Sequence, residues 1–319
     1  MKIKDGIVGF VVGDALGVPV EFESRNKLKD SPVTEMIGYG TYHQPKGTFS
    51  DDSSMILATM DSIIKRGHID YEDIMDCFSE WCYNGKYTPF GETFDIGITT
   101  RKAIANYTKN PPLECGEKDF RDNGNGSLMR ILPIAFMDVD KETIKEMSAL
   151  THAHDISKTA CVYYCYLVRT ILENSEKTLK ENIQITNSKM KEMYKDDDIL
   201  NIFDGIVDEI IFDYPEEDIK STGYVVDTLE SVIYCLLNND NYKDTVLAAV
   251  NLGGDTDTIA AIAGGVAGIY YGYDSIPREW IDSITKIDYV LELWEEFEKV
   301  IRWMLKKPLK ISEKNVIAI

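Results

Sequence analysis

Hydroxyl and carboxylate side chains crowd the stretch Gly47-Thr48-Phe49-Ser50-Asp51-Asp52-Ser53-Ser54-Met55. Apolar side chains then recur at helical spacing as far as Arg66, and Gly67 follows as a stop signal. Ser50 is a good N-cap, and the two aspartates fall in the first turn, where the helix dipole favours negative charge. The sequence therefore predicts a helix over residues 51–66 that begins with a pair of carboxylates.

Helical periodicity also dominates the rest of the chain. It predicts helices at Tyr71–Tyr83, Ile98–Tyr107, Lys141–Leu150, Lys158–Leu172, Val225–Leu237, Thr258–Ile269 and Tyr289–Met304. Alternation with period two is scarce, and we expect loops at Val33–Tyr42 and Tyr87–Phe94. The polar stretch from Glu173 to Ser221 is expected to be a helical excursion or a linker. The sequence predicts an all-α protein with no sheet in its core, in one domain over residues 1–319.

Composition restricts the classes of protein to consider. The chain has 319 residues, of which 44% are hydrophobic and 28% charged, as in an ordinary globular protein. Its net charge of −20 argues against nucleic-acid binding, which needs a basic face. This acidity indicates either a solvated surface or attraction of a cationic protein partner. The apolar residues 7–20 are interrupted by Asp14 and three glycines, so we expect neither a secretory signal nor a membrane span, and a cytoplasmic location.

Cysteine and histidine are poor candidates for metal ligands in this chain. The six cysteines contain no Cys-x-x-Cys unit, and Cys161 and Cys165 are one helical turn apart. We therefore expect reduced cysteines that lie mostly in the core. With only four histidines, a histidine-rich site is also unfavourable. Any metal site should use oxygen ligands.

A second unusual stretch precedes the helix predicted at residues 258–269, and it reads Asn251-Leu252-Gly253-Gly254-Asp255-Thr256-Asp257-Thr258. Carboxylates and hydroxyls again gather at a helix start, here after a glycine pair that permits close backbone approach. An EF-hand is excluded, because the sixth and twelfth positions from Asp255 are Ala260 and Val266.

Together the two stretches supply enough hard oxygen donors for two metal ions. The predicted ligands are Ser50, Asp51, Asp52, Asp255, Asp257 and Thr258. Carboxylates at facing helix ends would repel one another unless cations lay between them, and oxygen ligands suit Mg²⁺ or Mn²⁺. The alternative is that both groups are simply helix caps.

A third stretch, Asn123-Gly124-Asn125-Gly126-Ser127-Leu128-Met129-Arg130, is rich in glycine and asparagine. Free N–H groups in such a loop, at a helix start, can cradle a phosphate. It is not a Walker loop, since no Gly-Lys-Ser/Thr follows. The alternative here is a turn and a cap.

In their order along the chain, these motifs resemble the ADP-ribosylglycohydrolase family. The resemblance covers nearly the whole length and begins with Gly13-Asp14-Ala15-Leu16-Gly17 and Glu21. It continues through Ser50-Asp51-Asp52 and residues 124–130 to Gly253-Gly254-Asp255-Thr256-Asp257-Thr258. Members of this family usually carry threonine at the positions of Ser50 and Ser53, and serine keeps the ligand oxygen at position 50.

The resemblance implies an orthogonal helical bundle with a binuclear Mg²⁺ or Mn²⁺ centre, held by the six ligands above. It also implies that Glu21 lies near the metals as a group for water activation or proton transfer. Residues implied to contact ADP-ribose are Asn125, Gly126, Ser127, Met129 and His154. For His154, an ordinary histidine at a helix end is the alternative.

Two further segments are similar to the bacterial branch that removes ADP-ribose from arginine, typified by the dinitrogenase-reductase-activating glycohydrolase. They are Phe94-Asp95-Ile96-Gly97-Ile98-Thr99-Thr100-Arg101 and Gly223-Tyr224-Val225-Val226-Asp227-Thr228-Leu229-Glu230. The resemblance implies that Asp95 faces the guanidinium and Tyr224 the nucleotide. An N-cap role is the alternative for Asp95.

These features predict hydrolysis of the N-glycosidic bond between ribose and arginine, with Glu21, Asp95 and Asp52 as the catalytic residues. The expected partner is an ADP-ribosylated protein, and the expected state is a monomer. The alternatives are serine-linked or other ADP-ribosyl substrates, and a relative that only binds ADP-ribose. A helical prenyl or terpene synthase is disfavoured, because Asp51-Asp52 does not continue as Asp-Asp-x-x-Asp.

Overall fold

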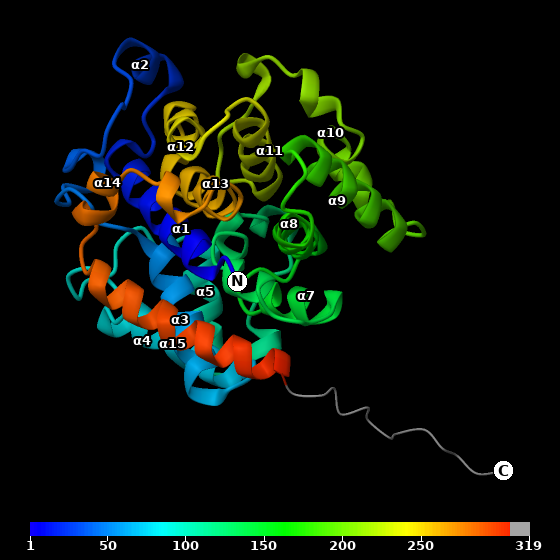
Figure 1. Ribbon diagram of the computed structural model, residues 1–319. Coiled ribbons are helices and arrows are strands. Elements are labelled where there is room, and N and C mark those ends of the chain that lie inside the picture. The colour runs from blue at the N-terminus through cyan, green and yellow to red at the C-terminus, as the bar shows by residue number, and fades with distance from the viewer. Residues whose placement is uncertain (307–319) are drawn as a thin grey trace.

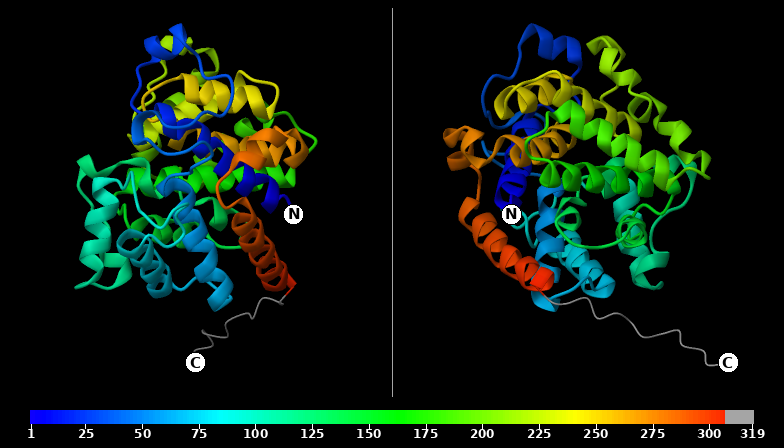
Figure 2. Two further views of the ribbon diagram at one scale, coloured as in Figure 1. Left: turned by 90° about the vertical axis from the view of Figure 1, so that its left-hand side faces the viewer. Right: turned by 45° about the vertical axis from the view of Figure 1, so that its right-hand side comes forward.

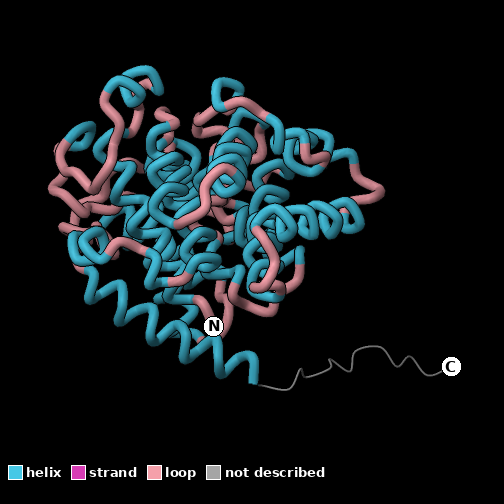
Figure 3. Tube along the Cα trace, turned by 45° about the horizontal axis from the view of Figure 1, so that its top comes forward, coloured by secondary structure: helices cyan, strands magenta, loops and turns pink. Residues whose placement is uncertain are grey.

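The computed structural model describes residues 1–306, and all regular elements in that range are helical (Figure 3). The α-helices are α1 (Ile3–Gly17), α2 (Arg25–Asp30), α3 (Asp51–Arg66), α4 (Tyr71–Asn84), α5 (Ile98–Tyr107), α6 (Leu132–Ala135), α7 (Lys141–Ala149), α8 (Asp155–Glu173), α9 (Leu179–Met193), α10 (Asp204–Val207), α11 (Val225–Leu237), α12 (Tyr242–Asn251), α13 (Thr256–Tyr271), α14 (Arg278–Ser283) and α15 (Ile287–Lys306). The 3₁₀ helices are η1 (Val18–Val20), η2 (Gly40–Tyr42), η3 (Pro112–Glu114), η4 (Phe120–Asp122), η5 (Asn125–Ser127), η6 (Asp198–Phe203), η7 (Ile210–Asp213), η8 (Glu216–Asp218) and η9 (Tyr273–Ser275). The predicted all-α class is confirmed.

Helices α1 and α13 lie side by side in the interior (Figures 1 and 2). Their backbones touch because glycines remove the side chains between them: a Cβ on Gly9 would lie 2.4 Å from the carbonyl oxygen of Gly264. A Cβ on Gly13 would lie 2.1 Å from the carbonyl oxygen of Ala260. This contact brings the end of α1 against the beginning of α13, where Asp257 is located.

Two groups of helices pack around this central pair. Helices α3, α4 and α15 lie together on one side, and α7, α8, α9 and α11 lie together on the other (Figure 1). Helix α12 packs against α13. Core side chains from all of these elements belong to one hydrophobic cluster.

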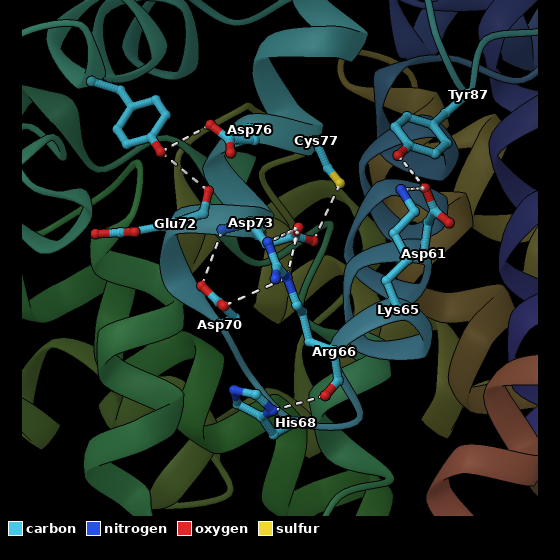
Figure 4. Close-up of polar contacts among 11 residues, drawn as sticks. Asp61, Lys65, Arg66, His68, Asp70, Glu72, Asp73, Asp76, Cys77 and Tyr87 are labelled. Carbon is cyan, nitrogen blue, oxygen red and sulfur yellow. Dashed lines mark hydrogen bonds and ion pairs between the residues drawn. The ribbon is translucent and has the colours of Figure 1, made fainter.

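The turn between α3 and α4 shows how exposed charges fix local geometry (Figure 4). Helix α3 ends at Gly67, whose φ is +69°, and Asp70 then caps α4 by accepting a hydrogen bond from the Asp73 N–H. Arg66 spans the turn, with nitrogens 3.6 Å from Asp70 and 2.8 Å from Asp73. Exposed ion pairs of this kind contribute little to stability, so this network mainly orients the turn.

The polar stretch after Glu173 is helical, so the linker alternative is wrong. Helix α9 starts with a capping box in which Thr178 and Glu181 satisfy each other's backbone N–H groups. The stretch returns to the body of the protein through Arg25, which donates hydrogen bonds to the carbonyls of Glu216 and Ile219 at 2.5 and 2.6 Å. Arg25 also donates to the Leu252 carbonyl at 2.9 Å and thereby ties the excursion to the segment before α13.

All eight predicted helices are present, and α3, α5 and α11 have the predicted bounds. Helices α1, α2, α6, α12 and α14 were not predicted, and Gly40–Tyr42, which form η2, lie in an expected loop. All six cysteines are free, and five of them are buried. None of the helices in residues 1–306 is long and apolar enough to cross a membrane.

Candidate functional site

Seven acidic side chains from separate parts of the chain meet beside the junction of α1, α3 and α13. They are Asp14, Glu21, Asp51, Asp52, Asp95, Asp255 and Asp257. The close approach of α1 and α13 brings Asp257 to the end of α1, where the Thr256 hydroxyl donates a hydrogen bond to the Gly17 carbonyl at 2.8 Å. A Cβ on Gly17 would lie 2.3 Å from the Asp257 Cα, so only glycine permits the contact.

Asp14 connects α1 to the start of α3. Its carboxylate accepts hydrogen bonds from the backbone N–H groups of Ser50 and Ser53 at 2.9 and 3.0 Å, and from the Ser53 hydroxyl at 2.5 Å. Burial nevertheless raises the pKa of Asp14 to about 6. The sequence analysis included Asp14 only as part of a family motif and assigned it no role.

Three of the six predicted ligand residues belong to two groups of carboxylates that share Asp257. In each group, one oxygen per residue lies within 4.8 Å of the others. The first group is Asp14, Asp52 and Asp257, and the second is Glu21, Asp255 and Asp257. Three predicted ligands, Asp52, Asp255 and Asp257, thus come together, and the structure adds Asp14 and Glu21 to them.

The remaining predicted ligands surround these two groups. The Thr258 hydroxyl lies 3.2 Å from an Asp52 carboxylate oxygen, and the Ser50 hydroxyl lies 3.3 Å from the same atom. Asp51 is buried, and burial followed by the neighbouring carboxylates raises its pKa well above the ordinary value. Ser50 also accepts the Asp52 N–H, so it is an N-cap as predicted.

The chemistry of this cluster fits divalent cations. Two buried carboxylate oxygens, Oε2 of Glu21 and Oδ2 of Asp257, have no hydrogen-bond partner. Burial, followed by the charges of neighbouring carboxylates, raises the pKa values of Asp52 and Asp257 well above their ordinary value. Unpartnered anionic oxygens are costly unless a positive charge lies among them. Hard oxygen donors of this kind are the ligands that Mg²⁺ and Mn²⁺ prefer.

Asp95 enters the cluster from the loop before α5. Its φ of +58° is unusual for a non-glycine residue, and the Tyr42 hydroxyl donates a hydrogen bond to its carboxylate at 2.5 Å. Helix α5 begins after Gly97 without a side-chain cap, so the N-cap alternative for Asp95 is wrong. Burial and the neighbouring Asp95 raise the pKa of Tyr42 far above its ordinary value, which keeps its hydroxyl protonated. The sequence analysis missed Tyr42 because it lies in a predicted loop.

The glycine-rich segment lies against the other side of the cluster. Asn125 donates a side-chain hydrogen bond to Asp255 at 2.6 Å and another to Thr228 at 3.0 Å, and its backbone N–H donates to the Gly223 carbonyl. The segment does not open an α-helix as expected: residues 125–127 form the short η5, and α6 begins only at Leu132. Its Asn125 thus hydrogen-bonds both to the acidic cluster and to the first turn of α11.

A pocket of about 550 Å³ adjoins this segment, lined by Phe120, Arg121, Asn123, Gly124, Gly223 and Tyr224. It is next to the acidic cluster, because a Cβ on Gly223 would lie 3.3 Å from a carboxylate oxygen of Asp255. Tyr224, predicted to contact a nucleotide, is part of the wall. Phe120, which the sequence analysis did not identify, is 65% exposed and presents a second aromatic ring there.

The remaining residues predicted to contact ADP-ribose do not line this pocket. His154 caps α8, since its Nδ1 accepts the Ile156 N–H at 3.3 Å and lies 3.0 Å from the Asn123 side chain. His152 was not predicted, yet its ring lies against Gly126, where a Cβ would approach it to 2.8 Å. Ser127 is fully buried and Met129 is 3% exposed in the hydrophobic core.

The buried carboxylates predict how stability depends on pH. A raised pKa means that the folded protein retains protons that the unfolded chain has already lost, so the free energy of unfolding falls as pH rises. For the metal-free protein we expect the melting temperature to fall from about pH 4 to pH 6 and above, since burial raises the pKa of Asp14 from 3.8 to about 6 and those of Asp52 and Asp257 also lie high. Asp61 and Asp140, whose pKa values are lowered, titrate below this range, while His152, whose pKa burial lowers from 6.5 to about 3, adds an opposing rise up to about pH 6.5 from one group against several carboxylates.

This prediction can be measured by thermal unfolding in EDTA and in Mn²⁺ across pH 5 to 8. Protons compete with metal for the same oxygens, so the stabilisation by Mn²⁺ should grow with pH. A melting temperature in EDTA that rises over this interval would contradict the prediction.

The helical architecture and the buried carboxylates at meeting helix ends define an all-helical protein with an oxygen-rich site next to a pocket. The family model described as ADP-ribosylglycohydrolase matches residues 1–308, and the chain therefore belongs to the ADP-ribosylglycohydrolase family.

Individual relatives agree with this assignment. The chain is 30% identical over 305 residues to the ADP-ribosylarginine hydrolase Tri1 of Serratia proteamaculans, covering 92% of this chain and 78% of the relative. It is 29% identical over 297 residues to the ADP-ribosyl-[dinitrogen reductase] glycohydrolase of Rhodospirillum rubrum, covering 89% and 90%. A solved structure described as an ADP-ribosylglycohydrolase-related protein complex superposes with a TM-score of 0.78 at 25% identity, covering 94% of this chain and 97% of that one.

Proposed function

We propose that this protein is a metal-dependent hydrolase that removes ADP-ribose from mono-ADP-ribosylated proteins by cleaving the N-glycosidic bond to arginine. The observation that carries this proposal is the cluster of buried carboxylates directly beside a pocket with two aromatic walls. The carboxylates suit metals that bind a ribose diol, and the aromatic walls suit a nucleobase. Family membership supports the ADP-ribosyl part of the proposal.

The metal ligands proposed are Asp52, Asp255 and Asp257, with Asp14 and Glu21 completing the two carboxylate groups. Ser50, Asp51 and Thr258 supply further oxygens around them. When bound, two Mg²⁺ or Mn²⁺ ions supply electrophilic assistance to ribose oxygens and lower the pKa of water. Asn125 holds Asp255 in position through its 2.6 Å hydrogen bond.

The other residues of the site bind the substrate and transfer protons. Phe120 and Tyr224 border the base, and the backbone of η5 borders the diphosphate. Glu21, whose pKa is raised by burial and by Asp95 and Asp255, holds a proton readily and can pass it to the departing nitrogen or accept it from water. Asp95 stabilises the positive charge of the guanidinium side.

Two observations support arginine as the acceptor of ADP-ribose. A carboxylate held by Tyr42 at the rim of the cluster suits a cationic leaving group. In addition, two relatives at 30% and 28% identity are named ADP-ribosylarginine hydrolases.

The test is to follow release of ADP-ribose from arginine-linked and serine-linked ADP-ribosyl proteins in Mg²⁺, Mn²⁺ and EDTA. We expect release from the arginine linkage in either metal and none in EDTA. Release from serine alone would replace the arginine assignment. No release from either substrate by correctly folded protein would contradict hydrolase activity and leave a protein that only binds ADP-ribose.

A substitution separates the role of Asp95 from that of the loop that carries it. Asp95→Asn retains an acceptor for the Tyr42 hydroxyl but loses the charge, so we expect kcat to fall by about 10²–10⁴-fold with little change in stability. The matched control is Glu92→Gln, an exposed position in the same loop, which should keep full activity. Steady-state kinetics measures both, and an unchanged kcat in Asp95→Asn would remove this residue from the mechanism.

A further inference from the structure

The side chain of Arg130 is unusual because it is fully buried without a negatively charged partner. Its exposure is 0%, and one guanidinium nitrogen donates to the Met147 carbonyl and the Thr151 hydroxyl, both at 2.8 Å. Its Nε and the other terminal nitrogen have no hydrogen-bond partner. The guanidinium carbon lies 4.9 Å from the centre of the Phe78 ring.

Only partial negative charges compensate this cation. Met147 and Ser148 are in the last turn of α7, so Arg130 meets the negative end of that helix, which amounts to about half an elementary charge. Within residues 1–306 no carboxylate pairs with it, and burial raises the pKa of the neighbouring Cys161 thiol, which is therefore uncharged at neutral pH. Burial lowers the pKa of Arg130 only to about 10, so the guanidinium remains protonated at neutral pH. A net positive charge therefore remains in the interior.

This charge lies directly behind the segment that borders the pocket. Arg130 is the last residue of the glycine-rich stretch, and its guanidinium donates to the Thr151 hydroxyl. That hydroxyl lies 2.9 Å from Nδ1 of His152. The His152 ring in turn lies against the backbone of Gly126. It also lies near Gly124, where an added Cβ would be 3.6 Å from its Nε2. Because Thr151 accepts from Arg130, its own hydrogen can go to Nδ1 of His152. Burial and Arg130 lower the pKa of His152 to about 3, so this ring is neutral.

We propose that Arg130 is a specificity-determining residue whose uncompensated buried charge selects a ligand bearing a diphosphate at the Gly124–Ser127 segment. A positive charge is needed here because the same segment also contacts the acidic cluster, through the hydrogen bond from Asn125 to Asp255. Carboxylates repel phosphate to the extent that bound metal leaves them uncompensated, and a cation behind the segment attracts phosphate in a medium that screens charge weakly. The proposal rests on the proposed function for the identity of the ligand.

The test compares binding of ADP-ribose, which carries the diphosphate, with binding of adenosine, which carries no charge. Calorimetry in Mg²⁺ would use the parent protein, Arg130→Met and Arg130→Lys. We expect Arg130→Met to weaken ADP-ribose binding by about tenfold or more, while Arg130→Lys, whose buried ammonium is more easily deprotonated, should lie between the parent and Arg130→Met. Adenosine affinity should be the same in all three proteins.

A second pair of variants addresses the case in which Arg130→Met does not fold. Cys161→Asp leaves Arg130 in place and sets a carboxylate near it, so it should neutralise the charge and weaken ADP-ribose binding to a similar extent. Cys161→Asn has the same shape as Asp without the charge, so it shares any disturbance of the Ser127 hydroxyl that Cys161 contacts at 3.5 Å, and it should bind ADP-ribose more tightly than Cys161→Asp. Equal losses for Asp and Asn at position 161, or parallel losses of adenosine and ADP-ribose affinity, would overturn the proposal. Failure of the parent protein to bind ADP-ribose would instead contradict the proposed function.

Discussion

Asp257→Asn should lower turnover by about a thousandfold or more and should leave the metal-free protein at least as stable as the parent. Asp257 belongs to both carboxylate groups, so its loss removes an anionic ligand from each proposed metal ion, and metal assistance contributes several kcal/mol to such reactions. The expected effect on stability is the opposite of the effect on turnover. Burial and neighbouring carboxylates disfavour the ionised form of Asp257, and an amide removes that cost while its oxygen still accepts the Thr258 N–H.

Three measurements on this variant give a distinctive combination. Turnover and the stabilisation by Mn²⁺ should both fall, whereas the melting temperature in EDTA should stay equal or rise. ADP-ribose should still bind through the pocket beside residues 124–127, although more weakly. Asp61→Asn is the control, because Asp61 pairs with Lys65 and Lys86 away from the cluster and should not affect turnover. Undiminished stabilisation by Mn²⁺ in Asp257→Asn would exclude this carboxylate as a ligand.

Gly13→Ala should destabilise the protein by about 3–5 kcal/mol, one of the largest effects that a single methyl group can have. The new Cβ would lie 2.1 Å from the Ala260 carbonyl oxygen and 2.6 Å from its carbon. Both atoms belong to the backbone of α13, so no side-chain rotation relieves the clash. The helices must separate, and the separation moves Asp14 away from Asp257, so activity should fall together with stability.

Chemical denaturation of Gly13→Ala and of a matched variant measures this effect. Gly97→Ala is the control: its Cβ would meet the Thr100 hydroxyl at 3.8 Å, an ordinary contact, so stability should change by less than about 1 kcal/mol. A Gly13→Ala protein with the parent's stability would show that α1 and α13 do not depend on backbone contact.

The elements that could be predicted are those with one apolar face. Helix α3 is bounded by the Ser50 cap and by Gly67, whereas α5 and α11 have no side-chain cap and their bounds follow from their periodic apolar residues. Helix α1 could not be found in this way, because it is buried on nearly all sides and its apolar residues show no periodicity. Its glycines indicate a breaker when only the sequence is known, and they become interpretable only when α13 is beside them.

The candidate site shows the same division between local and long-range information. Asp52, Asp255 and Asp257 were identifiable because acidic residues crowd two helix starts, and the structure brings them together. Asp14 and Tyr42 were not, since an aspartate in an apolar stretch and a tyrosine in a loop carry no local signal of their partners Ser50 and Asp95. Their positions depend on packing between segments far apart in sequence.

The contact between α1 and α13 also determines when the protein can become active during its synthesis. The backbone surface that residues 3–17 must meet is translated about 240 residues after them. Contacts between such distant segments form late in folding. The acidic cluster, which needs Asp14 and Asp257 together, is therefore completed only after α13 has been translated. A nascent chain that ends before Asp255 carries five of the seven carboxylates of the cluster without a complete site, and we expect activity only once α13 has been translated and packed against α1.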